Sequence, residues 1–219
     1  MWLVAAFYTK ATQYENHARN LIESLKEFKL PYEITPIDNL GDWYKNMQFK
    51  PTFLKQMLEK YHPHSIVYVD VDAVFYRYPA LFDQLDRMPN LSVGVHILDH
   101  SKYRRRNHPP ELLSGTIFLK NNQKTSIIIN EWIEECKKDS RLWDQRALAS
   151  VLREKDFYVL PEEYCTIFDY MSSVKYPVIK HFQASRVERN ASKKPQANSV
   201  RVIRKAGCVR NGRFHHKRK

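Results

Sequence analysis

The sequence predicts an α/β domain built on a mostly parallel central sheet. Along the first 185 residues, short apolar runs typical of strands alternate with longer segments whose apolar residues recur at helical spacing. The chain has 219 residues, of which 43% are apolar and 13% aromatic, and is therefore long and hydrophobic enough to bury a core. No apolar run approaches the roughly 20 residues of a transmembrane helix.

Two kinds of segment support this fold class. The predicted strands are short runs rich in β-branched and aromatic residues, at 2–8, 32–37, 65–69, 91–97, 112–119, 157–160 and 178–179. The predicted helices have one apolar face and cover 14–28, 51–61, 126–136 and 144–152. Pro51 fits the first turn of the second helix, where the missing N–H of proline costs no hydrogen bond.

Charge divides the chain near residue 185. Residues 186–219 hold twelve Lys and Arg and one acidic residue, and so carry +11 of the net charge of +12. We therefore predict a domain over 1–185 and a basic C-terminal extension over 186–219. The extension fits either a polyanionic partner, such as nucleic acid or an anionic membrane surface, or a solubilising role. The basic residues expected to contact such a polyanion are Arg104, Arg105, Arg106, Arg204, Lys205 and Arg213.

Cysteine usage bears on the compartment. Cys136, Cys165 and Cys208 are odd in number and widely spaced, so they form neither a disulfide framework nor a metal-ligand pattern. The apolar N-terminus lacks the basic start of a signal peptide. Both observations favour a cytoplasmic location, which for a viral protein would be the host cytoplasm.

Two aspartates follow the strand predicted over 65–69. Asp70 and Asp72 are one residue apart, which places both carboxylates on the same side of an extended chain. Ligands of open α/β sheets bind at the carboxyl ends of strands. Carboxylate oxygens suit Mg²⁺ or Mn²⁺, which in turn bind diphosphates. A pair of turn or capping aspartates is the structural alternative.

The segment 66–75, IVYVDVDAVF, resembles the metal-binding strand and D-x-D motif of GT-A-fold glycosyltransferases. Further segments match nucleotide-diphospho-sugar transferases in the same order: KPTF at 50–53, LSGTIF at 113–118, WDQ at 143–145 and KHF at 180–182. The resemblance covers about residues 1–186. It implies a GT-A (Rossmann-like) fold and a transferase that uses Mn²⁺ or Mg²⁺ and a nucleotide-sugar donor, with a UDP-hexose expected.

The resemblance also implies roles for single residues. The metal ligands would be Asp70, Asp72 and His181, and the donor-binding residues would be Thr9, Tyr14, Lys50, Asp70, Ser114, Gly115 and Arg186. Tyr14 would stack on the base, although a core aromatic at this place is equally compatible. Lys50 would approach a phosphate, or be a solvated lysine at the start of a helix. Arg186 would meet the diphosphate, but the family often has a glycine and a lysine near this point, where Ala184 and Arg186 stand here.

Asp144 and Gln145 bear on the stereochemistry of transfer. They resemble the D-Q element of retaining families, in which the aspartate binds donor hydroxyls and the neighbouring polar group lies beside the anomeric carbon. The expected reaction is therefore retaining. An inverting enzyme would instead use Asp144 as general base, and the N-cap of a helix over 144–152 is compatible with either role.

Other functions stay open on the sequence alone. A nucleotidyltransferase also uses paired aspartates and a metal ion, and the basic extension fits a nucleic-acid-binding module. The acceptor of a transferase would be a hydroxylated base in viral DNA, a surface glycan or a protein.

Overall fold

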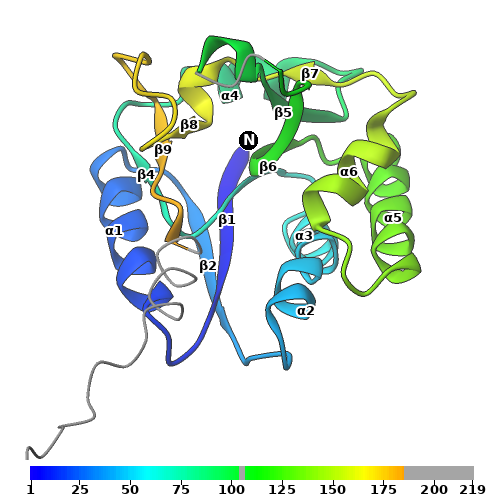
Figure 1. The fold of residues 1–219 in the computed structure, drawn as a ribbon. Coiled ribbons are helices and arrows are strands. Elements are labelled where there is room, and N and C mark those ends of the chain that lie inside the picture. The colour runs from blue at the N-terminus through cyan, green and yellow to red at the C-terminus, as the bar shows by residue number, and fades with distance from the viewer. Residues whose placement is uncertain (104–106, 185–219) are drawn as a thin grey trace, which may run out of the picture. The chain divides into compact units, whose positions relative to one another are not determined.

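The computed structural model describes residues 1–103 and 107–184, which include a six-stranded central sheet (Figure 1). The strands of this sheet are β1 (Trp2–Thr9), β2 (Tyr32–Ile37), β3 (Ser65–Val69), β5 (Val93–Leu98), β6 (Glu111–Leu119) and β7 (Tyr158–Val159). Their order across the sheet is β2–β1–β3–β6–β5–β7. All are parallel except β6, which runs antiparallel to β3 and β5. The predicted α/β class with a mostly parallel sheet is confirmed.

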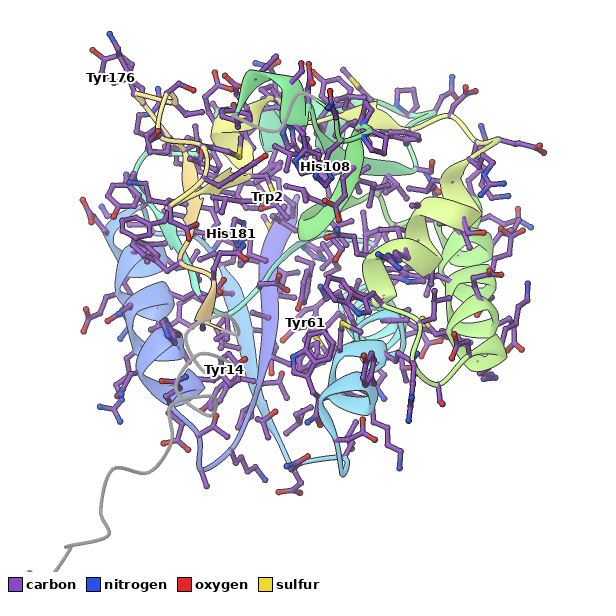
Figure 2. The ribbon with its side chains drawn as sticks, in the orientation of Figure 1. Trp2, Tyr14, Tyr61, His108, Tyr176 and His181 are labelled. Carbon is purple, nitrogen blue, oxygen red and sulfur yellow. The ribbon has the colours of Figure 1, made fainter. Side chains whose placement is uncertain are left out.

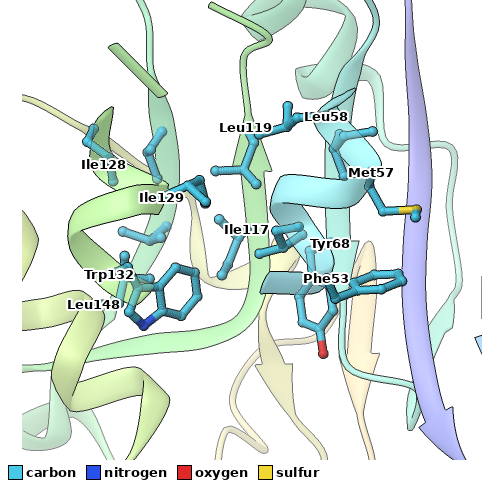
Figure 3. Packing of buried hydrophobic residues seen from close by; sticks show 14 of the residues in the cluster. Phe53, Met57, Leu58, Tyr68, Ile117, Leu119, Ile128, Ile129, Trp132 and Leu148 are labelled. Atoms are coloured by element: carbon cyan, nitrogen blue, oxygen red, sulfur yellow. The ribbon is translucent and has the colours of Figure 1, made fainter. Parts of the chain in front are cut away.

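Helices cover both faces of the sheet. They are α1 (Tyr14–Glu27), α2 (Trp43–Gln48), α3 (Lys50–Lys60), α4 (Ala80–Arg87), α5 (Gln123–Lys138) and α6 (Asp144–Leu152), with short 3₁₀ turns η1 (His100–Lys102) and η2 (Glu162–Tyr164). One core joins α3, α5 and α6 to the sheet, as Figure 3 shows for Phe53, Ile129 and Trp132. A second core on the opposite face includes Leu21 of α1 and Phe82 of α4.

Strand β3 is buried on both faces, because alternate residues enter the two cores. Ile66 and Tyr68 belong to the core with α3, and Val67 and Val69 to the core with α1. Such a strand reads as a continuous apolar run, and this is why its end could be located from the sequence.

A second, three-stranded sheet has the order β4–β9–β8, with β4 (Ala73–Phe75), β8 (Thr166–Ile167) and β9 (Ile179–His181). The antiparallel register of β4 and β9 pairs Ala73 with His181. The fold thereby brings His181 beside Asp72, although more than a hundred residues separate them in the chain.

The sequence missed several elements that are short or have polar surfaces. Helix α2 has no buried residue and is set by its N-cap, where the Asp42 carboxylate accepts from the backbone N–H of Lys45. Helix α5 begins earlier than predicted, because Asn122 caps it by accepting from the N–H of Thr125. The short strands β4 and β8 were also missed, whereas the equally short β7 and β9 overlap the strands predicted at 157–160 and 178–179.

Several predicted features lie outside the described residues. They are Arg104, Arg105, Arg106, Arg186, Arg204, Lys205, Arg213 and the extension over 186–219. The domain boundary at 185 therefore stays a prediction. Within the described ranges, no helix has the length and apolar character needed to cross a bilayer.

Candidate active site

Asp70 lies at the carboxyl end of β3, where its neighbours hold it in place. Its backbone N–H donates to the Gly115 carbonyl on β6 at 2.8 Å, and the Tyr68 hydroxyl donates to Asp70 Oδ1 at 3.0 Å. Burial raises the pKa of Tyr68 well above its usual value, so the hydroxyl remains a donor. The Asp70 side chain is 43% exposed and therefore open to a ligand.

Lys50 joins Asp70 to Asp144. Its Nζ lies 3.0 Å from Asp70 Oδ1 and 2.9 Å from Asp144 Oδ2, and also donates to the Ser114 hydroxyl and carbonyl oxygens at 3.2 Å. Burial by itself lowers the pKa of Lys50, but the charges of Asp144 and Asp70 outweigh it and hold the pKa above its usual value. The lysine is thus a buried counter-ion for two carboxylates.

The structure decides against one of the two sequence interpretations of Lys50. The side chain is only 6% exposed, so it is not a solvated lysine at a helix start. Its ammonium group is already surrounded by four oxygen atoms, which leaves it little capacity to bind a phosphate as well. In the structure it bridges Asp70 and Asp144, and a phosphate-binding role stays a prediction.

Ser114 links Asp144 and Gln145. The Ser114 hydroxyl donates to Asp144 Oδ2 at 3.0 Å, and the Ser114 backbone N–H donates to Gln145 Oε1 at 3.2 Å. Asp144 is the first residue of α6, and the N-cap position belongs to Trp143. The carboxylate of Asp144 is therefore turned to Lys50 and Ser114 rather than used as the predicted cap.

Asp72 and His181 form a second polar group. Asp72 Oδ1 lies 3.5 Å from His181 Nδ1, and Asp72 Oδ2 accepts from the backbone N–H of Ala184 at 2.8 Å. His181 Nε2 lies 2.8 Å from the Thr116 hydroxyl. Burial lowers the pKa of His181, but hydrogen bonds with Asp72 and Cys165 outweigh this and raise it to about 10. For Asp72, burial is opposed by the hydrogen bond with His181, and its pKa falls below the usual value.

The two polar groups meet at Gly115. A Cβ atom built there would lie 3.4 Å from Asp70 Oδ2 and 3.5 Å from His181 Nδ1. The absent side chain leaves a space lined by a carboxylate oxygen and an imidazole nitrogen, which are ligand types of Mn²⁺. Among the described residues, no group of three or more His, Cys, Asp and Glu is already arranged to hold a metal ion. The side chains of Asp70, Asp72 and His181 are of the types that bind a metal ion, and they lie close together. In this structure they contact other protein atoms.

The predicted base-binding residues lie at the end of β1 and the start of α1. Thr9 is buried, and its carbonyl accepts from the Thr12 hydroxyl at 2.6 Å. Tyr14, labelled in Figure 2, is half-buried and packs against the core beside α1. Its ring lies 6.4 Å from that of His17. This packing is that of a core aromatic, and a donor role for either residue stays a prediction.

Comparison with protein families gives the decisive observation. Residues 40–197 match the model of the nucleotide-diphospho-sugar transferase family. The chain belongs to this family. It is a nucleotide-sugar glycosyltransferase, and the sequence resemblance is confirmed.

Solved structures share the GT-A fold of this transferase. A glycosyltransferase involved in the glycosylation of the major capsid of PBCV-1 is 14% identical, with TM-score 0.65, over 87% of this chain and 98% of that chain. Mouse xyloside xylosyltransferase 1 is 15% identical, with TM-score 0.56, over 84% and 98%. The galactosyltransferase LgtC is 11% identical, with TM-score 0.56, over 84% and 87%. A search of curated protein sequences finds no match.

Three residues of the transferase site were missed on the sequence. Tyr68 and Thr116 contact Asp70 and His181, and Glu111 contacts Gln145. Tyr68 had a usable signal, since a residue two positions before Asp70 lies on the same side of a strand. No sequence pattern pointed to Glu111, because its partner Gln145 lies on a helix far along the chain.

The space at Gly115 gives a testable expectation. Gly115→Ala should weaken Mn²⁺ binding by the UDP-loaded transferase about 10-fold or more, because the added methyl group occupies the space between Asp70 and His181. Calorimetric titration of Mn²⁺ measures this. Gly94→Ala is the matched control, since its Cβ would meet Phe118 Cβ at 3.3 Å in the core and should change stability only. Equal Mn²⁺ affinity in both variants would contradict a metal site here.

Proposed function

We propose that this transferase moves a hexose from a UDP-sugar to an acceptor hydroxyl, with retention of the anomeric configuration and with Mn²⁺ or Mg²⁺. The observation that carries the proposal is the continuous polar group of Lys50, Asp70, Asp144 and Ser114, to which Gln145 is attached. It offers carboxylate oxygens for sugar hydroxyls next to an amide. Asp70, Asp72 and His181 would hold the metal ion, which when bound would neutralise charge on the leaving diphosphate.

The contacts of Asp144 support retention. A general base needs a carboxylate oxygen within reach of the acceptor hydroxyl. The Asp144 side chain is only 4% exposed, and its Oδ2 already accepts from Lys50 and Ser114. These contacts favour a role for Asp144 in holding Lys50 and Ser114 at the donor side of the site over a role as the general base.

The acceptor we propose is a glycan or a glycosylated protein. The described residues hold 21 Lys and Arg against 23 Asp and Glu, so their net charge gives no support for a polyanionic acceptor. One structural neighbour is a glycosyltransferase involved in the glycosylation of the major capsid of PBCV-1, and another is mouse xyloside xylosyltransferase 1. This part of the proposal rests on analogy of fold.

A cytoplasmic location belongs to the same proposal. Cys136 and Cys165 are buried free thiols, a state that a reducing compartment maintains.

The experiment is a donor screen followed by stereochemistry. UDP-glucose, UDP-galactose, UDP-N-acetylglucosamine and GDP-mannose are incubated with the protein and Mn²⁺, and sugar release is measured with and without EDTA. We expect a UDP-hexose to be hydrolysed only with metal. Proton NMR in the first minutes should then show the α-anomer released from the α-linked donor. Release of the β-anomer would make the enzyme inverting, and full turnover in excess EDTA would overturn the metal requirement.

A further inference from the structure

The side-chain amide of Gln145 is held at both ends. Its Oε1 accepts from the Ser114 backbone N–H at 3.2 Å, and its Nε2 donates to Glu111 Oε1 at 2.7 Å. The first contact needs the oxygen of the amide and the second needs the nitrogen, because an ionised carboxylate only accepts hydrogen bonds. The two contacts therefore agree on one orientation of the amide.

Glu111 is itself held from the other side. Its Oε2 lies 3.1 Å from His100 Nε2, and His100 Nδ1 lies 2.8 Å from the Tyr170 hydroxyl. A histidine that carries its proton on Nε2 donates to Glu111 and accepts from Tyr170. His100 is buried, whereas the Glu111 side chain is 44% exposed. The buried ring thus anchors a carboxylate at the first residue of β6.

We propose that Glu111 is a positioning residue for transfer, which fixes the orientation of the Gln145 amide, and that His100 holds Glu111 in place. This inference rests on the proposed function, in which Gln145 lies beside the anomeric carbon. A reversed amide would set its N–H₂ against the Ser114 N–H, two donors facing each other. Ser114 also binds Asp144 and Lys50, so the orientation of the amide is coupled to the donor-binding carboxylates.

The first test separates orientation from binding and folding. In Glu111→Met, the side chain keeps its size but cannot accept from Gln145. We expect kcat for hydrolysis of the preferred UDP-hexose with Mn²⁺ to fall about 10–100-fold, with the donor KM and the melting temperature little changed. Glu111→Gln retains an acceptor oxygen for Gln145 and should recover most of the lost kcat. The matched control is Glu134→Met on α5, whose partner Lys137 lies on the surface.

A double-mutant cycle tests whether Glu111 acts through Gln145. If it does, adding Glu111→Met to Gln145→Ala should cost no further activity. This inference is overturned, but the proposed function is not, if the losses of activity from the two substitutions add. The same conclusion follows if Glu111→Met keeps full turnover while Gln145→Ala is impaired. Full turnover by Gln145→Ala overturns the proposed function and this inference with it.

The orientation of the Gln145 amide can also be tested by NMR, without measuring turnover. In the ¹H–¹⁵N spectrum, the side-chain amide of Gln145, assigned with Gln145→Glu, should have one proton shifted downfield and protected from exchange. That signature should be lost in Glu111→Met and kept in Glu134→Met. An amide signal identical in wild type and Glu111→Met would show that Glu111 does not orient it.

Discussion

Asp72→Asn is expected to lower kcat/KM for UDP-hexose turnover roughly 1000-fold, a loss of about 4 kcal/mol of transition-state stabilisation. The substitution removes the negative charge of a proposed metal ligand while changing little volume. An asparagine oxygen still accepts from the backbone N–H of Ala184, as Asp72 Oδ2 does. The fold should therefore be retained, and Mn²⁺ titration should show weakened binding.

The control for Asp72 is another aspartate without a role in the site. Asp38 pairs with Lys10 on the surface, with 87% of its side chain exposed, so Asp38→Asn should leave turnover and Mn²⁺ affinity unchanged. Asp72→Asn with wild-type turnover would refute the metal mechanism. The metal mechanism would be refuted even if Asp72→Asn had lost Mn²⁺ binding, provided that its turnover was normal.

Lys50→Met should destabilise the protein by about 3–5 kcal/mol, because it leaves Asp144 buried without its counter-ion. The methionine side chain keeps most of the volume, so the loss measures charge rather than a cavity. Urea unfolding gives the free energy of unfolding. Turnover should also fall, since Asp70 and Asp144 would lose the group that holds them 2.9–3.0 Å from one ammonium.

Two further variants identify the cause of the loss. Lys50→Met combined with Asp144→Asn removes the uncompensated charge and should be more stable than Lys50→Met alone. Lys10→Met breaks an exposed ion pair and should cost less than about 1 kcal/mol. If Lys50→Met and Lys10→Met had similar stability, Lys50 would not be the buried counter-ion described above.

Some elements of the fold could be predicted because their own residues form a recognisable pattern. The strand ending at Val69 and the aspartates after it were predicted, because a strand buried on both faces is a continuous apolar run and Asp70 ends it. The helix with Pro51 in its first turn was predicted because proline there and the apolar face that follows it are both visible in the local sequence.

The remaining features depend on contacts between distant segments. The burial of Lys50 results from α3, β3 and α6 meeting, and no pattern near residue 50 encodes it. The antiparallel direction of β6 depends on its two neighbours in the sheet. The partnership of Glu111 with Gln145 likewise joins a strand to a helix that follows later in the chain. Sequence reasoning named many of the residues that the structure brings together, but not the contacts between them.

The spread of the site along the chain has a consequence for its assembly during synthesis. Lys50 and Asp70 are made early, but Asp144 follows Asp70 by 74 residues, and His181 meets Asp72 through β9, the last strand among the described residues. A nascent or truncated chain that ends before β9 therefore lacks the contact between Asp72 and His181, however well its first strands have paired. Under the proposed function, we expect turnover only after β9 has paired with β4, so that turnover would report correct folding.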